Sequence, residues 1–143
     1  MQEKYSAAKM GLIGLMNTLK IESQTNNVYS REILPVAFKR MTENLHPAEG
    51  IGERLLPEVV TPAVIYLASE DAPNGVMIGA GAGVFTRVHI HETMGVAFGT
   101  GLDMTPENIA ANWDQISDME DARSIYQGGE QTIKIFEQAD KEK

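Results

Sequence analysis

The strongest pattern of apolar and polar positions lies near the start of the chain. Residues 4–22 read KYSAAKMGLIGLMNTLKIE and place apolar side chains at three- and four-residue steps, at Tyr5, Ala8, Leu12, Leu15, Met16 and Leu19. This spacing predicts an amphipathic helix. Gly11 and Gly14 each destabilise a helix by about 1 kcal/mol relative to Ala. We expect these small residues to permit close approach of another backbone.

The next signal along the chain predicts a strand. Residues 28–34, VYSREIL, have the composition of a strand that stops before Pro35. A strand covered on both faces should be a near-continuous apolar run. Arg31 and Glu32 interrupt that run. We therefore expect this strand to lie at an edge of the sheet or to be only partly covered.

The middle of the chain predicts further helices and a strand. A short helix is expected around residues 40–45 and a longer one at 57–69. Pro62 fits the start of the longer helix and Thr61 fits its cap, because Pro is favoured in the first turn and Thr can accept a backbone hydrogen bond there. Residues 75–85, GVMIGAGAGVF, predict a short apolar strand and then a glycine-rich corner.

The last third of the chain predicts one strand and two helices. Residues 84–92, VFTRVHIHE, alternate between two faces, which is typical of a half-exposed strand. Residues 104–116 predict a helix in which Thr105 is the cap and Pro106 takes the first position. A final helix is expected after the glycine pair at 128–129. We find no internal repeat.

Composition and charge narrow the class of protein. The 143 residues fit one domain, 43% of them are hydrophobic, and the formal net charge is −8. An acidic surface repels nucleic acid and anionic membranes, so we expect neither as a partner. The absence of cysteine excludes disulfides and thiolate metal sites. No apolar run reaches the ~18 residues of a membrane span, and the start of the chain lacks the apolar core of a signal peptide. We expect a cytoplasmic protein.

Tyr5 and Lys9 are the leading candidates for chemistry. They lie four positions apart, which places the phenol and the ammonium on one face of the predicted helix. A nearby positive charge stabilises a phenolate, so such a Tyr can exchange a proton with a carbonyl or an alcohol. The spacing alone does not separate this role from that of a surface pair, because the two residue types meet at this spacing in many helices.

Two other groups have the side chains of metal ligands, but their spacing argues against a metal site. His89 and His91 project from one strand face with Glu92 beside them, and such residues can bind zinc. No further ligand shares that face. The acidic residues near the C-terminus lack a calcium-loop spacing; they are Asp114, Asp118, Glu120 and Asp121. We expect exposed surfaces at both places and no bound metal.

The context of Tyr5 and Lys9 is more specific than their spacing. The segment YSAAKMGLIGLMNTLKIE, followed by a short strand and Pro35, resembles the short-chain dehydrogenase/reductase family, whose motif begins Y-x-A-[SA]-K. Later segments of that family are similar to ILPVAFKRMTENL and PEVVTPAVIYLASEDAPNGVMIGAGAG, in the same order. The tail, with VFTRVHIHET and MTPENIAANWDQISDME, is similar to one branch, the 3-hydroxyacyl-CoA dehydrogenase unit of peroxisomal multifunctional enzymes and their bacterial relatives.

The resemblance implies an α/β fold, namely an incomplete doubly wound, Rossmann-like domain that contains only the C-terminal half of the family fold. Residues 1–83 would be the family core remnant, and residues 84–143 a C-terminal extension with an added strand and helices. The family's glycine-rich phosphate turn and its catalytic Ser precede the Tyr helix, so we expect this chain to lack them. GAGAG at 79–83 does not replace that turn, because its spacing differs and no helix is predicted after it.

The matched half also departs from the family pattern. Arg31 and Leu34 stand where the family has Asn and a small residue, and Lys39 stands where the family has a Thr that helps to hold the nicotinamide amide. These departures suggest relaxed constraints on cofactor binding. Pro35 and Val36 remain compatible with lining a nicotinamide pocket.

Three functional hypotheses follow. In the first, the chain is a truncated short-chain dehydrogenase that keeps Tyr5 and Lys9 but binds no cofactor and is inactive alone. It then self-associates as a homodimer or larger oligomer through the helix at 5–22. In the second, a partner or a longer chain supplies the missing half, and NAD or NADP serves the oxidation of a 3-hydroxyacyl-CoA-like substrate. Tyr5 is then the acid/base and Lys9 holds the ribose, while Pro35 and Val36 line the cofactor pocket. In the third, the scaffold is a binding module whose ligand the sequence does not identify.

Overall fold

The structure is a computed structural model that describes residues 2–38 and 50–142. Its helices are α1 (Gln2–Glu22), α2 (Ile51–Arg54), α3 (Thr61–Ala68), α4 (Pro106–Ala111), α5 (Trp113–Ile116) and α6 (Gly128–Ala139), with short 3-10 turns η1 (Gln24–Asn26), η3 (Pro57–Val60) and η4 (Asp140–Glu142). Its strands are β1 (Glu32–Pro35), β2 (Met77–Gly81), β3 (Val84–Val88), β4 (His91–Glu92) and β5 (Arg123–Ser124). The short helix expected around 40–45 and the position of Lys39 lie outside the described residues.

The chain divides into two compact units, residues 1–88 (unit 1) and residues 89–143 (unit 2). β3 belongs to unit 1, so the structural division falls after residue 88. The boundary at 83, expected between a family core and an extension, concerns correspondence with the family and stays a prediction. In the part of the chain that the structure describes, we find no helix with the length and apolarity needed to cross a bilayer.

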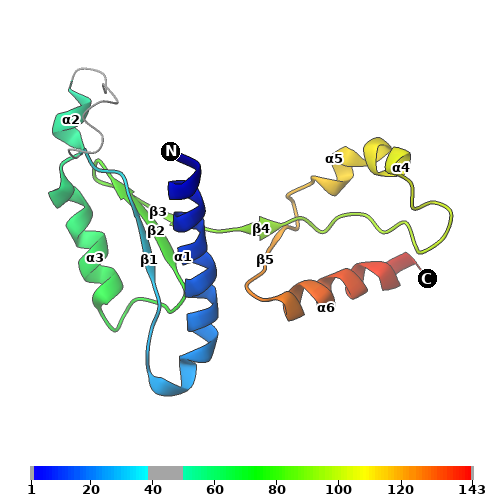
Figure 1. The fold of residues 1–143 in the computed structure, drawn as a ribbon, viewed down its shortest axis with the longest axis horizontal. Coiled ribbons are helices and arrows are strands. Elements are labelled where there is room, and N and C mark those ends of the chain that lie inside the picture. The colour runs from blue at the N-terminus through cyan, green and yellow to red at the C-terminus, as the bar shows by residue number, and fades with distance from the viewer. Residues whose placement is uncertain (1, 39–49, 143) are drawn as a thin grey trace. The chain divides into compact units, whose positions relative to one another are not determined.

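The sheet of unit 1 has the strand order β1-β2-β3. β1 and β2 run parallel and are connected through α3, whereas β2 and β3 form an antiparallel hairpin. α1 lies on one face of this sheet and α3 on the other (Figure 1). β1 is an edge of the described sheet, as its charged residues predicted. A parallel strand–helix–strand unit with helices on both faces is part of a doubly wound fold, so the predicted fold class is confirmed.

Two apolar clusters, one on each face of the sheet, hold unit 1 together. The cluster beneath α1 consists of Ile13, Met16 and Met77, with Leu34 and Val88 packed against it. The cluster beneath α3 consists of Val60, Ala63 and Ala80, with Ile33, Ala37 and Ile78 packed against it. Neighbouring residues of β1 and β2 thus serve opposite faces, as the strand period requires. Burial of a large apolar side chain contributes roughly 1.5–3 kcal/mol, so the buried Ile, Met and Val side chains of these clusters stabilise unit 1 substantially.

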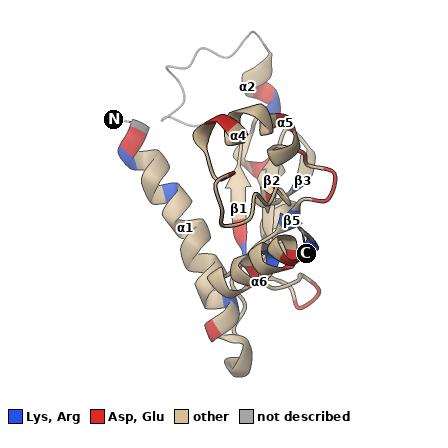
Figure 2. Cartoon of the chain, turned by 90° about the vertical axis from the view of Figure 1, so that its right-hand side faces the viewer, with Lys and Arg blue, Asp and Glu red and all other residues tan. Residues whose placement is uncertain are grey.

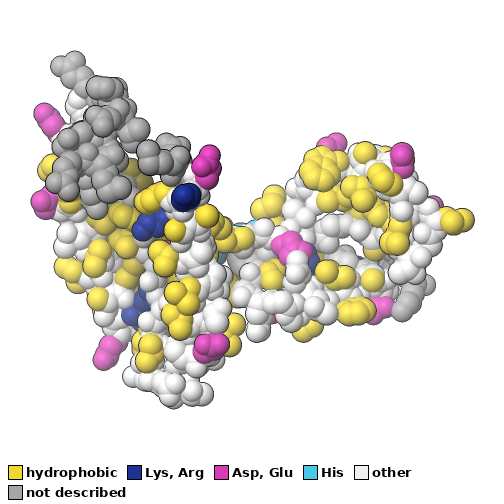
Figure 3. Space-filling view, in the orientation of Figure 1, with side chains coloured by type: hydrophobic (Ala, Val, Ile, Leu, Met, Phe, Trp, Pro, Cys, Tyr) yellow, Lys and Arg dark blue, Asp and Glu magenta, His cyan; other side chains and the backbone are white. Residues whose placement is uncertain are grey.

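α1 confirms the predicted helix but buries only a narrow stripe of it. The apolar residues beside the buried stripe remain exposed: Leu12, Leu15 and Leu19. The middle of α1 carries no charged residue (Figure 2), and hydrophobic side chains are visible along the surface of unit 1 (Figure 3). The close approach expected at Gly11 and Gly14 is not observed, because no described atom lies within 4 Å of a Cβ added at either position.

Compared with the strand predicted at 28–34, the observed strand β1 starts later and ends one residue later. β1 begins at Glu32 and includes Pro35. Upstream, the N–H of Ser30 donates to Asn74 Oδ1 at 2.9 Å, so this segment is held by the loop before β2 rather than by strand pairing. Pro35 is tolerated because the hydrogen bonds to β2 come from the N–H groups of Glu32 and Val36. The backbone nitrogen of Pro35, between them, points toward the free edge, where no donor is needed.

Arg31 joins the start of β1 to the end of α3. Its guanidinium donates hydrogen bonds to the carbonyl oxygens of Leu67 at 2.7 Å, Ser69 at 3.0 Å and Pro73 at 3.1 Å, and to that of Ala72. The last carbonyl groups of a helix have no partner within it. Arg31, which departs from the family's Asn, satisfies those of α3 and of the turn that follows.

The helix predicted at 57–69 is confirmed, but its start differs. The 3-10 turn η3 runs directly into α3, and Thr61 is the first residue of α3 rather than its cap. Val60 holds the capping position without a side-chain hydrogen bond. It already has helical backbone angles, with φ −86° and ψ −23°, because the preceding turn leads the chain into the helix.

The single strand predicted at 84–92 is two strands in different units. β3 ends at Val88, whereas β4 pairs antiparallel with β5. The alternation of side chains predicted strand structure on both sides of the break. It could not show that the pairing partner changes there, because a period of two carries no information about the neighbouring strand.

The helix predicted at 104–116 begins as expected and then breaks. The N–H of Asn108 donates to Thr105 Oγ1 at 3.1 Å, which confirms the cap, and Pro106 is the first helical residue. At Asn112 the helix divides into α4 and α5. The Asn112 side chain donates to the carbonyl of Asn108 at 2.8 Å, and such side-chain bonds compete with helix continuation. The final helix, α6, starts at the glycine pair itself rather than after it.

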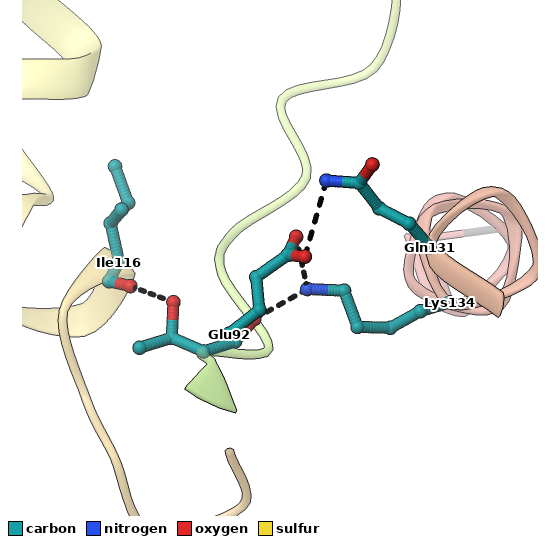
Figure 4. Close-up of polar contacts among 5 residues, drawn as sticks. Glu92, Ile116, Gln131 and Lys134 are labelled. Atoms are coloured by element: carbon teal, nitrogen blue, oxygen red, sulfur yellow. Dashed lines mark hydrogen bonds and ion pairs between the residues drawn. The ribbon is translucent and has the colours of Figure 1, made fainter. Parts of the chain in front are cut away.

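Unit 2 is organised around a buried lysine. Lys134 of α6 is 5% exposed, and its Nζ donates to Glu92 Oε1 at 2.7 Å and to the carbonyl of Thr93 at 2.6 Å (Figure 4). Gln131 donates to the other carboxylate oxygen of Glu92 at 3.1 Å. The hydrogen bond from Lys134 holds the pKa of Glu92 below its ordinary value, although desolvation acts against it. Among the described residues of unit 2, no apolar side chain is buried.

Candidate active site

Tyr5 and Lys9 lie on the first turns of α1, on the side that faces the sheet. At about 100° per residue, positions 5, 9 and 16 fall within roughly 40° of one another, and Met16 is buried against the sheet. Tyr5 is nevertheless 59% exposed, and Lys9 is exposed as well. The inward-facing stripe therefore continues beyond the part of the sheet that α1 covers.

The structure brings the side chains of Tyr5 and Lys9 together, as the spacing predicted. Lys9 Nζ lies 5.6 Å from the centroid of the Tyr5 ring, within the range of a cation–π contact. The ammonium thus lies against the ring rather than on the phenol oxygen. The Lys9 stem is flexible, so a rotamer change brings its charge toward the hydroxyl or toward a ligand beside it.

The N-terminal end of α1 and the carboxyl end of β1 lie at the same end of unit 1, because the two elements run in opposite directions (Figures 1 and 2). Val36 follows Leu34 by two positions, and Leu34 packs beneath α1, so Val36 lies on the α1 face. Pro35 has the opposite parity and lies on the α3 face. Of the four predicted site residues, Tyr5, Lys9 and Val36 therefore share a face and an end, whereas Pro35 lies at the same end but on the opposite face.

A hollow of about 250 Å³ opens at the carboxyl ends of β1 and β2. Its lining residues are Val36, Leu55, Gly79, Ala80, Gly81, Ala82, Val84 and Thr86. Open α/β sheets bind ligands outside the carboxyl ends of their parallel strands. The position and the mostly apolar lining of this hollow fit a flat ring better than a charged group.

Two glycines of β2 give this hollow its depth. A Cβ added at Gly81 would lie 2.6 Å from the carbonyl oxygen of Val36, and one at Gly79 would lie 2.6 Å from Thr86 Oγ1. Any larger residue would push against the neighbouring strand. Sequence reasoning did not identify these glycines as site residues. Their two-residue spacing, which places both on one face of a strand, is the signal that could have found them.

The segment GAGAG is a strand end followed by a turn, as predicted. Gly79 to Gly81 belong to β2, and Ala82 and Gly83 form a two-residue hairpin turn with positive φ values of 50° and 77°. β3 rather than a helix follows. The described residues thus offer an apolar hollow at the strand ends, but no strand–turn–helix cradle of the kind that holds a pyrophosphate.

The two histidines near the unit boundary stand close together. The ring centroids of His89 and His91 are 5.4 Å apart, in an edge-to-face arrangement. The third residue considered with them, Glu92, uses its carboxylate oxygens on Lys134 and Gln131. Within residues 2–38 and 50–142, no group of three His, Asp or Glu side chains is arranged to hold a metal ion.

Comparison with known proteins identifies relatives but no matching family model. Peroxisomal multifunctional enzyme type 2 of Mus musculus is 36% identical over 146 aligned residues, which cover 99% of this chain and 20% of the mouse enzyme. A short-chain type dehydrogenase/reductase of Mycobacterium tuberculosis is 38% identical over 125 residues, which cover 85% of this chain and 42% of that protein. The chain thus spans less than half the length of each of these curated relatives.

A solved structure extends the likeness to the fold. Full-length peroxisomal multifunctional enzyme type 2 from Drosophila melanogaster matches with a TM-score of 0.77 and 32% identity, over 96% of this chain and 25% of that chain. The names of these multifunctional enzymes place them in peroxisomes, and the cytoplasmic location expected for this chain stays a prediction. The resemblance drawn from the motifs is confirmed: the chain matches part of a short-chain dehydrogenase/reductase region.

Proposed function

We propose that residues 1–143 are the part of a short-chain dehydrogenase that carries its acid/base pair, and that they neither bind NAD or NADP nor catalyse hydride transfer alone. One observation carries this proposal. Tyr5 and Lys9 are exposed although they continue the sheet-facing stripe of α1, at the end of unit 1 where the ring-sized hollow opens. Similarity to proteins named as dehydrogenases supports the reaction class.

In an assembled enzyme, the residues of this chain would handle the proton. The Tyr5 hydroxyl gives its proton to a carbonyl oxygen as hydride arrives, or takes it from an alcohol as hydride leaves. Lys9 places a positive charge beside the phenolate and reaches the ribose. Val36 lines the ring hollow, and Pro35 stiffens the strand end that presents it. A bound nicotinamide cofactor would supply or accept the hydride.

We propose further that the chain self-associates through α1, as a homodimer or a larger oligomer. The exposed stripe of Leu12, Leu15 and Leu19 borders a hollow of about 220 Å³ beside the free edge of β1. Glu32, which also lines this hollow, has a buried side-chain oxygen, Oε2, that finds no hydrogen-bond partner among the described residues. Buried polar atoms are normally satisfied. The exposed apolar stripe and the unsatisfied Glu32 oxygen beside it therefore support association at this surface.

A second candidate function is favoured by the apolar hollow at the carboxyl ends of the strands. Here a partner or a longer chain supplies the nucleotide-binding part, and the assembly is an NAD(P)-dependent oxidoreductase of 3-hydroxyacyl-CoA-like substrates. The likeness to the multifunctional enzymes supports this substrate class.

The test is complementation. The purified chain is assayed with NAD and a 3-hydroxyacyl-CoA, alone and after mixing with the separately expressed portion of the M. tuberculosis relative that lies outside the match. We expect no NADH formation from the chain alone and measurable formation from the mixture. Tyr5→Phe should lower the rate of the mixture about 10²–10⁴-fold, because it removes the transferred proton. Tyr29→Phe is the matched control, since the Tyr29 hydroxyl donates to Asn27 Oδ1 at 2.8 Å and takes no part in the proposed chemistry.

Two results would overturn the proposal. Activity of the chain alone would show that the cofactor site is complete within it. Equal rates for Tyr5→Phe and Tyr29→Phe in an active mixture would remove the acid/base role from Tyr5.

A further inference from the structure

Asn74 and Gly75 form the only asparagine–glycine pair in the sequence, and they lie in the turn before β2. Ser30, which precedes β1, holds both of them. The N–H of Ser30 donates to Asn74 Oδ1 at 2.9 Å, and the N–H of Gly75 donates to the carbonyl oxygen of Ser30 at 2.8 Å. These two hydrogen bonds, called the Ser30 contact below, fix the turn against the segment that leads into β1.

The side chain of Asn74 also holds the end of α1. Its Nδ2 donates to the carbonyl oxygen of Lys20 at 3.3 Å. This carbonyl belongs to the last turn of α1, whose C=O groups have no partner within the helix. One side chain therefore links α1, the segment before β1 and the turn before β2.

The backbone requires a glycine after Asn74. Gly75 has a positive φ of 68°, which glycine adopts without the cost that a Cβ brings. The Lys20 side chain also lies against Gly75, and a Cβ added there would clash with Lys20 Cδ. The contacts of Asn74 and the conformation of Gly75 thus bring together two residues whose sequence is chemically labile.

An asparagine loses its amide most readily before glycine, because no Cβ hinders the glycine nitrogen. The nitrogen of Gly75 gives up its proton and bonds to Asn74 Cγ, the Cγ–Nδ2 bond breaks, and the amide group leaves with that proton as ammonia. Water then opens the succinimide ring. Opening at Cγ leaves Asp, whereas opening at the main-chain carbonyl leaves isoaspartate, in which the backbone runs through Cγ.

The Ser30 contact opposes this reaction in the closed fold. Gly75 is buried and its N–H is bonded to Ser30, and the Asn74 side chain is held by the other backbone group of Ser30. The segment that must move to free them is weakly held, since Val28 and Tyr29 are 54% and 52% exposed and β1 is an edge of the described sheet. Such a segment opens locally far more often than the whole unit unfolds.

We propose that Asn74 is a deamidation site gated by the Ser30 contact, and that its modification releases the end of α1 from the sheet. In the Asp product an oxygen replaces Nδ2, so the carbonyl of Lys20 loses its donor. In the isoaspartate product the longer backbone moves the N–H of Gly75 away from Ser30. A brief opening thus has a permanent result. The proposal needs only the fold and does not depend on the dehydrogenase chemistry.

A second asparagine–glycine pair in the same chain tests the gate. Ala82→Asn creates this pair in the β2–β3 hairpin, where Gly83 is exposed. Peptide masses follow deamidation of both sites in the folded chain and in guanidinium chloride. We expect Asn74 to react at least about ten-fold more slowly than the new site in the folded chain, and at a similar rate in denaturant.

Three results would overturn the gate. They are equal rates at the two sites in the folded chain, no reaction of Asn74 in denaturant, and no isoaspartate at Asn74 after long incubation of the folded chain. An isoaspartate-specific methyltransferase with labelled methyl donor detects that product.

An Asn74→Asp variant tests the consequence for α1. Hydrogen exchange at the end of α1 should become about five-fold faster, as expected for the loss of one hydrogen bond. Asn108→Asp is the matched control, because Asn108 Nδ2 also donates to a backbone carbonyl, that of Asp103 at 2.8 Å, but in unit 2. Unchanged exchange in Asn74→Asp, or an equal increase in Asn108→Asp, would contradict the proposal. Wild-type chain enriched in isoaspartate provides the same measurement if Asn74→Asp does not fold.

Discussion

The two units of this chain are stabilised by different interactions. Unit 1 buries an apolar cluster on each face of its sheet, beneath α1 and beneath α3. In the described part of unit 2 the one buried side chain is Lys134, which is held by Glu92 and by the carbonyl of Thr93. The free energy of apolar burial does not depend on the ionisation of side chains, whereas that of a buried ion pair depends on the ionisation of both partners. The units should therefore respond differently to core truncation, loss of charge and pH.

The largest expected effect is on unit 1. Met77 is 5% exposed in the cluster beneath α1, whereas Met119 in unit 2 is 58% exposed. Met77→Ala should lower the stability of unit 1 by about 3 kcal/mol, because it leaves a cavity. Met119→Ala, the matched control, should change stability by less than about 0.5 kcal/mol. Hydrogen exchange resolved by segment measures both, and equal effects would break the comparison.

The next effect should be confined to unit 2. Glu92→Gln removes the charge that faces buried Lys134 and should destabilise unit 2 by about 2 kcal/mol, a value reduced from that of a fully buried pair because the Glu92 side chain is 37% exposed. Adding Lys134→Met should recover most of this loss, because an apolar side chain of similar length needs no partner. Hydrogen exchange in α6 reports the result. Faster exchange in α1 as well would contradict independent units.

The dependence on pH should follow the same division. Because the pKa of Glu92 is lowered in the folded chain, its contribution is present above the pKa of the unfolded chain and is lost as pH falls through the lower folded value. Trp113, the single tryptophan, lies in unit 2 and reports its unfolding by fluorescence. Wild type should lose stability relative to Glu92→Gln as pH falls. Parallel pH profiles of the two proteins would contradict this.

The smallest effect concerns the hairpin of unit 1. Ala82 has a positive φ of 50°. Residues other than Gly, Asn and Asp adopt this conformation at a cost in free energy. Ala82→Asn should stabilise the chain by about 0.5–1 kcal/mol, because Asn-Gly is the favoured pair for this turn. Gly83→Ala at φ 77° should destabilise by a similar amount. Thermal unfolding measures both shifts, and shifts of the same sign would show that backbone conformation does not control this turn.

Local signals predicted the elements whose cause is local. The amphipathic period located α1, and Thr105 with Pro106 located the start of α4. The errors arose where contacts distant in sequence decide the structure. Asn74 holds Ser30 and shortens β1 at its start, and the partner of the 84–92 segment changes from β2 to β5 at the unit boundary. The role of Lys134 was also missed, because its burial depends on β4.

The candidate site shows the same limit. The i, i+4 rule was enough to pair Tyr5 with Lys9. The hollow beside β2 could not be predicted, because the Gly79 and Gly81 positions matter only once Val36 and Thr86 are placed against them by the neighbouring strands.

The most direct test of the central claim is a calorimetric titration of the chain with NADH and with NADPH, after its mass has confirmed residues 1–143. If these residues carry the acid/base pair without a cofactor site of their own, no saturable heat should appear up to millimolar cofactor. Saturable binding at lower concentration would contradict the account and would show that the chain, alone or across copies, builds a complete nucleotide site.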